Sequence, residues 1–160
     1  MTKKRGLLLA LFMAAIVAAD QLTKALVRAN IPYGEAVPLL PGVVQLTYVR
    51  NKGAAFSMLG GARWLFLALV VLFFTVVAVL IRRKLLAKPF ELWCVAAIGG
   101  GAIGNAVDRA LTGEVTDMIE PLFVNFAVFN VADCFITCGA IALAVYILFF
   151  DGKEKIRDKG

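Results

Sequence analysis

The 160-residue sequence contains no histidine, and its only serine is Ser57. Histidine is the usual base beside a nucleophilic serine or cysteine and the commonest protein ligand of zinc. Its absence therefore excludes Ser–His and Cys–His catalysis and most zinc chemistry. We expect neither a metal nor a cofactor.

Cysteine is also scarce, with Cys94, Cys134 and Cys138 as the only three. They form no CxxC pair, and all three lie in apolar segments. Free cysteines in such segments usually act as small apolar packing residues. The sequence therefore predicts no disulfide framework.

Charge is low as well, at 18% of residues, against a hydrophobic content of 61% and a mean hydropathy of +0.86. A soluble domain of this length could not bury that many apolar side chains. The net charge of +6 comes from basic clusters at the ends of the apolar runs. Such clusters stay on the cytoplasmic side of a membrane, so they indicate topology and not a nucleic-acid partner.

Four apolar segments are long enough to cross a bilayer. The sequence predicts an all-α polytopic membrane protein, with residues 1–160 forming one integral membrane domain surrounded by lipid. The predicted spans are residues 6–27, 64–81, 90–111 and 131–150. Four spans place both termini in the cytoplasm, and every basic cluster then lies on that side.

Residues 30–62 and 112–130 are predicted to lie outside the membrane. In "VVQLTYVRN" (residues 43–51), apolar and polar residues alternate as in a β-strand with one polar face. "AAFSMLGG" (residues 54–61) is apolar but too short to span, which is typical of a short interfacial helix. "LFVNFAVFN" (residues 122–130) gives a second β-like run.

Eleven of the charges and amides outside the basic clusters gather at one level, the outer edge of the predicted spans. Ionisable groups inside a membrane are costly and are usually functional. The group consists of Asp20, Lys24, Arg50, Asn51, Lys52, Asn105, Asp108, Arg109, Asp117, Asn130 and Asp133.

Spacing suggests how some of these residues pair. Asp20 and Lys24 are four residues apart with the acid first, which is the favoured order for a helical ion pair. Gly100 and Gly104 form a GxxxG motif that allows close helix packing. Arg109 has two possible roles: it pairs with Asp108, or it positions a substrate carbonyl or a lipid headgroup.

Asp117 and Asp133 each lie close to a predicted span end. They are either two unrelated interfacial carboxylates or a pair. Two carboxylates close enough to share a proton can cleave a peptide bond, because one deprotonates water while the other donates a proton to the carbonyl oxygen.

Five motifs in order resemble those of the lipoprotein signal peptidase family, the bacterial signal peptidase II. They are "DQLTK" (20–24), "NKGAAF" (51–56), "GGAIGNAVDR" (100–109), "VTDMI" (115–119) and "FNVADCFI" (129–136). Within these motifs the sequence departs from the family at Met118, where Phe is common. The stretch between Asp117 and Asp133 is also short. Both departures concern the wall of the site and not the carboxylates.

This resemblance implies an aspartyl endopeptidase of the bacterial inner membrane. It would cleave a prolipoprotein just before its diacylglyceryl-modified cysteine, with its active site at the outer interface, and it would bind cyclic peptide inhibitors of the globomycin type. The family's small extracytoplasmic β-cradle and short interfacial helix would fall in the two outer segments. We expect a monomer.

The resemblance also implies roles for individual residues. The catalytic pair would be Asp117 and Asp133. The substrate-binding residues would be Asn51, Asn105, Arg109 and Asn130, and the supporting residues would be Asp20, Lys24 and Asp108.

Two other functions compete with this one. The first is a Ser/Lys hydrolase, in which Lys24 or Lys52 would activate Ser57. The second is a small membrane transporter or proton-relay subunit that uses interfacial aspartates (Asp20, Asp108 and Asp133). A carrier, however, usually places such groups near the bilayer midplane.

The variant Ser57→Ala separates the two hydrolases. If the carboxylates carry the reaction, prolipoprotein cleavage by Ser57→Ala should equal that of the unmodified protein in an assay of purified protein in detergent. A complete loss of cleavage would favour the Ser/Lys hydrolase.

Overall fold

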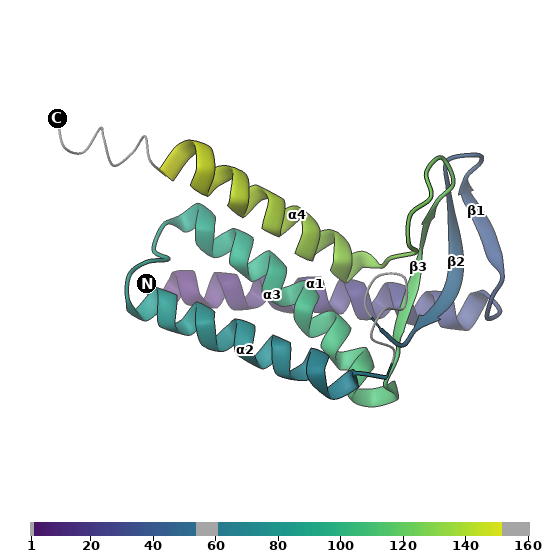
Figure 1. Cartoon of the computed structure of the whole chain (residues 1–160), viewed down its shortest axis with the longest axis horizontal. Helices are drawn as coiled ribbons and strands as arrows, with labels where there is room; N and C mark the ends of the chain where they lie inside the picture. Colours follow the sequence, from purple (N-terminus) through teal and green to yellow (C-terminus); the bar gives the residue numbers. More distant parts are fainter. Residues whose placement is uncertain (1, 54–60, 152–160) are drawn as a thin grey trace.

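The computed structural model describes residues 2–53 and 61–151. This part of the chain contains four helices that are long and apolar enough to cross a membrane, as the sequence predicts. They are α1 (Lys3–Asn30), α2 (Arg63–Arg82), α3 (Pro89–Thr112) and α4 (Val131–Tyr146), and α4 continues as the π-helical turn η2 (Ile147–Asp151). Figure 1 shows a small sheet at one end of the bundle and the start of α1 and the end of α4 at the other.

Helix α3 is the centre of the bundle, since it contacts each of the other three helices. Its GxxxG motif faces α1. A Cβ atom on Gly100 would lie 3.0 Å from Ile16 Cβ, and one on Gly104 would lie 2.6 Å from Asp20 Oδ2. The two glycines therefore allow the close packing that the motif predicts, and Gly104 also leaves room for the carboxylate of Asp20.

A second close contact, between α3 and α4, was not predicted. A Cβ atom on Gly101 would collide with the backbone oxygen of Ala132 and would lie 2.8 Å from Ile136 Cγ1. About two turns of α4 beyond Ala132, a Cβ on Gly139 would lie 3.0 Å from the backbone oxygen of Cys94. Small residues on both helices thus allow α4 to pack closely against α3. The first turn of α4, which carries Asp133, is part of this contact.

The sheet has three antiparallel strands in the order β1 (Ala36–Leu40), β2 (Val44–Asn51) and β3 (Val115–Pro121). Strand β2 corresponds to the predicted strand at residues 43–51. Strand β1 was missed because its sequence, AVPLL, contains Pro38. Proline is tolerated here because β1 is an edge strand, where one side of the backbone has no ladder partner to satisfy.

The predicted β-like run at residues 122–130 is wrong. Strand β3 ends directly before this run. Its last residue, Pro121, pairs with Val44, the first residue of β2. Leu122 N still donates to the backbone oxygen of Val43 at 2.8 Å, but Val43 precedes β2 and the ladder ends there. The chain then turns back, and only Phe129 forms an isolated bridge, with Ile119.

The predicted interfacial helix falls on residues 54–61, of which the structure describes only Gly61. Ser57, the nucleophile of the competing hydrolase, also lies outside the described residues.

The packing of α3 against α4 predicts that Gly101→Ala destabilises the protein. The new methyl group meets backbone, which cannot rotate away, so the helices have to separate at a cost of about 1–3 kcal/mol. We expect a lower midpoint of thermal unfolding in detergent, because α4 can no longer pack closely against α3.

The matched control is Gly99→Ala. Its Cβ would lie 3.1 Å from Phe74 Cζ and 3.3 Å from Met13 Cε, which are side-chain ends that can move. Equal unfolding midpoints for the two variants would contradict this account of the helix contact.

Candidate functional site

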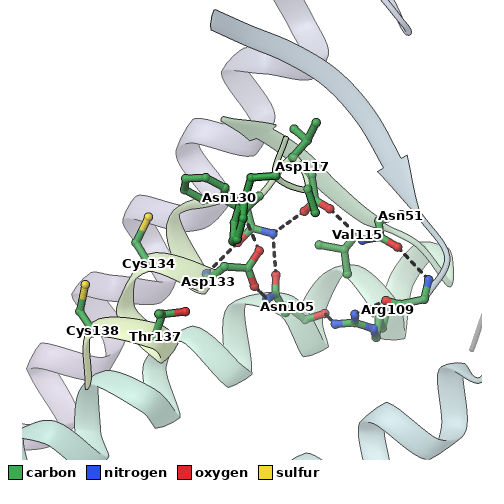
Figure 2. A pocket seen from close by; sticks show the side chains of 15 residues that line it. Asn51, Asn105, Arg109, Val115, Asp117, Asn130, Asp133, Cys134, Thr137 and Cys138 are labelled. Carbon is green, nitrogen blue, oxygen red and sulfur yellow. Dashed lines mark hydrogen bonds between the residues drawn. The ribbon is translucent and has the colours of Figure 1, made fainter. Parts of the chain in front are cut away.

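One cavity of about 490 Å³ lies where α3, α4, β2 and β3 meet. Figure 2 shows its lining, with Asp117 and Asp133 on different elements of the fold. All six residues that the sequence predicts for catalysis and substrate binding line it: Asn51, Asn105, Arg109, Asp117, Asn130 and Asp133.

Asp117 lies on β3 and is almost fully buried, with 3% of its surface exposed. Asn51 Nδ2 donates a hydrogen bond to its Oδ2 at 3.0 Å, and Asn130 Nδ2 donates to its Oδ1 at 2.7 Å. Burial raises the pKa of Asp117 from 3.8 to about 6. The Asn51 hydrogen bond opposes this rise in pKa, and the negative charge of Asp133 adds to it.

Asp133 is the third residue of α4 and forms a capping box with Asn130. The backbone N of Asn130 donates to Asp133 Oδ2 at 3.2 Å, and the backbone N of Asp133 donates to Asn130 Oδ1 at 3.0 Å. A carboxylate at this position satisfies an otherwise unpaired backbone N–H and lies at the positive end of the helix dipole. The helix start therefore explains how an acid is accommodated at the head of this apolar segment.

Asn130 links the two carboxylates and is itself fully buried. Its Nδ2 donates to Asp117 Oδ1 and, at 3.0 Å, to Asn105 Oδ1, while its backbone N and its Oδ1 cap Asp133. Asn105 Nδ2 completes the set by donating to Asp133 Oδ1 at 2.7 Å. Each of the four carboxylate oxygens thus accepts one N–H group.

The orientation of the Asn105 amide is fixed by Lys24. Lys24 is fully buried, and its Nζ donates to Asn105 Oδ1 at 2.9 Å. An ammonium group can only donate, so the oxygen of Asn105 has to face Lys24. Its Nδ2 is then left to face Asp133.

Lys24 also belongs to a buried ion network. Its Nζ lies 2.8 Å from Asp20 Oδ2, which is the pair that the sequence predicts, and 3.1 Å from Asp108 Oδ2. Arg28 Nη1 lies 3.8 Å from Asp108 Oδ1, so two acids alternate with two bases. The acids also accept backbone N–H groups, Asp20 from Ala132 at 3.0 Å and Asp108 from Thr116 at 3.2 Å, which ties α1 to α4 and α3 to β3.

Arg109 does not pair with Asp108, although this was one of its two predicted roles. Asp108 faces Lys24, and the next residue on a helix points about 100° away. Arg109 Nη2 instead donates to the backbone oxygen of Gly53 at 2.8 Å, and its guanidinium stacks on the Phe66 ring at 4.4 Å. The side chain thus remains at the cavity.

Sequence reasoning missed two members of the surrounding network, Arg28 and Gln21. Arg28 continues the series Asp20, Lys24 at the same four-residue spacing, which was the available signal. Gln21 Nε2 donates to the backbone oxygen of Gly104 at 3.0 Å. That contact depends on the glycine packing, and nothing in the sequence pattern indicates it.

No cluster of three or more potential metal-ligating side chains occurs within residues 2–53 and 61–151. The carboxylates at the cavity are surrounded by amide N–H donors, which suit an acid–base pair and not a cation.

The family model for signal peptidase (SPase) II matches residues 12–149, which is most of the chain. This chain belongs to the signal peptidase II family. Members from other bacteria are similar over nearly their whole length. The lipoprotein signal peptidase of Geobacillus kaustophilus is 42% identical over 147 residues, covering 89% of this chain and 94% of that protein. The one from Brevibacillus brevis is 37% identical over 144 residues, covering 90% and 96%.

Solved structures share the fold of this chain. Two bacterial membrane enzymes determined by the in meso method superpose with TM-scores of 0.83 and 0.79, each at 30% sequence identity. The first match covers 92% of this chain and 90% of that chain, and the second covers 89% and 93%. The chain is therefore a multi-pass bacterial membrane protein.

The ion network predicts a large effect of Lys24→Met on stability. The substitution leaves the buried carboxylates of Asp20 and Asp108 without their ammonium partner, which typically costs about 3–5 kcal/mol. The midpoint of thermal unfolding in detergent should fall accordingly, and activity should fall as the Asn105 amide loses its fixed orientation.

Lys52→Met is the matched control. Lys52 Nζ lies 3.4 Å from Glu114 Oε1, but its side chain is 68% exposed. Breaking an exposed pair costs at most about 1 kcal/mol. If both variants unfold at the same midpoint, the buried network does not have the role described.

Proposed function

We propose that Asp117 and Asp133 are the catalytic pair with which this signal peptidase acts. As a member of the signal peptidase II family, with relatives named lipoprotein signal peptidase, the protein is a peptidase that removes signal peptides from prolipoproteins. One observation carries the proposal: Asn130 contacts both carboxylates, and both line the same cavity.

The chemistry follows from two carboxylates that hold one proton. The ionised one takes a proton from a water molecule bound between them, and the resulting hydroxide adds to the scissile carbonyl carbon. The protonated one donates its proton to the carbonyl oxygen, giving a tetrahedral diol. Transfer of a proton to the amide nitrogen then breaks the C–N bond, and the carboxylates return to their starting state.

The asparagines keep the two carboxylates in this geometry. Each carboxylate oxygen accepts one hydrogen bond from an amide N–H and has a second lone pair available for water or substrate. We assign Asn51, Asn105 and Asn130 to orienting the pair, and Arg109 to holding a substrate carbonyl. Asp20, Lys24 and Asp108 support the site through Asn105 and through the first turn of α4.

The substrate we propose carries a diacylglyceryl group on the cysteine that follows the scissile bond. The carboxylates lie at the sheet end of the bundle, where α4 begins (Figure 1). With the basic ends of the spans in the cytoplasm, that end faces outward. Acyl chains in the outer leaflet would then hold the cysteine at the depth of the carboxylates, and the three-stranded sheet would form the cradle beside it.

Cyclic peptide inhibitors of the globomycin type would bind in the same cavity.

A single chain contains every residue that the mechanism uses. We therefore propose a monomer that needs no metal, and a chelator should leave its rate unchanged.

Replacing either carboxylate by an amide should abolish the reaction. General acid–base catalysis contributes about 10²–10⁴-fold to a rate, so Asp117→Asn and Asp133→Asn should each lose at least about 100-fold in cleavage of a lipid-modified prolipoprotein. The measurement is turnover by purified protein, with circular dichroism to show that each variant folds.

Glu120→Gln provides the control. It makes the same change of carboxylate to amide on the same strand, at a residue that bonds to Gln45 and Thr47 and does not line the cavity. Its turnover should match that of the unmodified protein. Retained turnover in either aspartate variant would refute the catalytic pair.

A further inference from the structure

The cavity continues past the carboxylates along α4. Its lining includes Asp133, Cys134, Thr137 and Cys138, which lie on one face of the helix (Figure 2). Thr137 is one turn beyond Asp133, about 6 Å along the helix axis at 1.5 Å per residue. A substrate that reaches Asp133 along this face therefore passes Thr137.

The hydroxyl of Thr137 differs from those of the other helical threonines. Thr23 donates to the backbone oxygen of Ala19, Thr75 to that of Val71 and Thr112 to that of Asp108, at 2.8–3.0 Å. This bond to the residue four positions earlier is the usual one for threonine in a helix. Thr137 makes no hydrogen bond to any described residue, so its hydroxyl is available at the cavity.

The signal peptide contains backbone carbonyls that need a hydrogen-bond donor. A signal peptide crosses the membrane as an apolar helix, and the last turn of any helix leaves backbone carbonyls without partners. In an apolar environment such carbonyls are costly unless another group donates to them. The chain around the scissile bond has to be extended to enter a catalytic site. The unpaired carbonyls of the helix therefore lie just before the scissile bond, on the signal-peptide side.

We propose that Thr137 Oγ1 donates a hydrogen bond to one of these backbone carbonyls and so sets the register of the signal peptide against the carboxylates. The rise of about 6 Å along α4 from Asp133 to Thr137 corresponds to about two residues of extended chain at 3.3 Å each. Thr137 is thus a positioning residue, and this role rests on the proposed catalytic pair. The neighbouring thiols of Cys134 and Cys138 are only weak donors, so they are poor substitutes for the hydroxyl.

Thr137→Val removes the hydroxyl and keeps the shape of the side chain. One hydrogen bond is worth about a three- to tenfold change in binding. We expect KM for a synthetic lipid-modified prolipoprotein to rise by that factor with kcat nearly unchanged, because the bond holds both substrate and transition state. Thr137→Ser should restore KM to within about twofold. Thr75→Val, on α2 and away from the cavity, is the matched control and should change neither constant.

A second measurement varies the substrate and compares the unmodified protein with Thr137→Val. Replacing one substrate amide by an ester weakens the preceding carbonyl as an acceptor, so an ester scan over the last turn of the signal peptide should find one position that raises KM. At that position, Thr137→Val should cause no further loss. Equal KM values for Thr137→Val and the unmodified protein, or an ester effect that is the same at every position, would overturn the role of Thr137.

The two proposals fail separately. If Asp133→Asn is inactive while Thr137→Val equals the unmodified protein, the catalytic pair stands and the register role is lost. If Asp133→Asn retains turnover, the pair itself is refuted, and the register role is lost with it.

Discussion

The site depends on one buried ammonium group. Lys24 is completely enclosed, and it can be held there only because Asp20 and Asp108 approach it at 2.8 Å and 3.1 Å. Its remaining contact, with Asn105 Oδ1, turns the Asn105 amide nitrogen toward Asp133. An ion pair that does not itself line the cavity thus determines which atoms face Asp133, one of the two proposed catalytic carboxylates.

Placing two acids together in a buried site costs stability near neutral pH. Burial raises the pKa of Asp117 to about 6, so near neutral pH this carboxyl is close to its titration point. A raised pKa means that the folded state favours the protonated form. The stability that this group contributes is therefore complete below about pH 4 and is lost as the pH rises through about 6. The donors from Asn51 and Asn130 limit that loss by stabilising the ionised form.

The sequence predicted the four helices, strand β2 and the residues that meet at the cavity, because hydropathy, alternation and family motifs are local signals. It did not predict β1 or the true bounds of β3, since strand pairing depends on a distant partner: Val44 decides where β3 ends. The contact between Gly101 and Ala132 was missed because a run of glycines does not show which neighbour each one faces. The capping box of Asn130 and Asp133 could have been read from the sequence, and it removes the apparent anomaly of an acid in an apolar segment.

The most direct test is an infrared titration of the carboxyl C=O band, with Asp117→Asn used to assign the signal of Asp117. If the two carboxylates lie together, Asp117 should lose its proton near pH 6 in the unmodified protein. In Asp133→Asn the midpoint should move down, because the neighbouring negative charge is gone. A midpoint near the ordinary value of 3.8 that does not respond to Asp133→Asn would contradict the account.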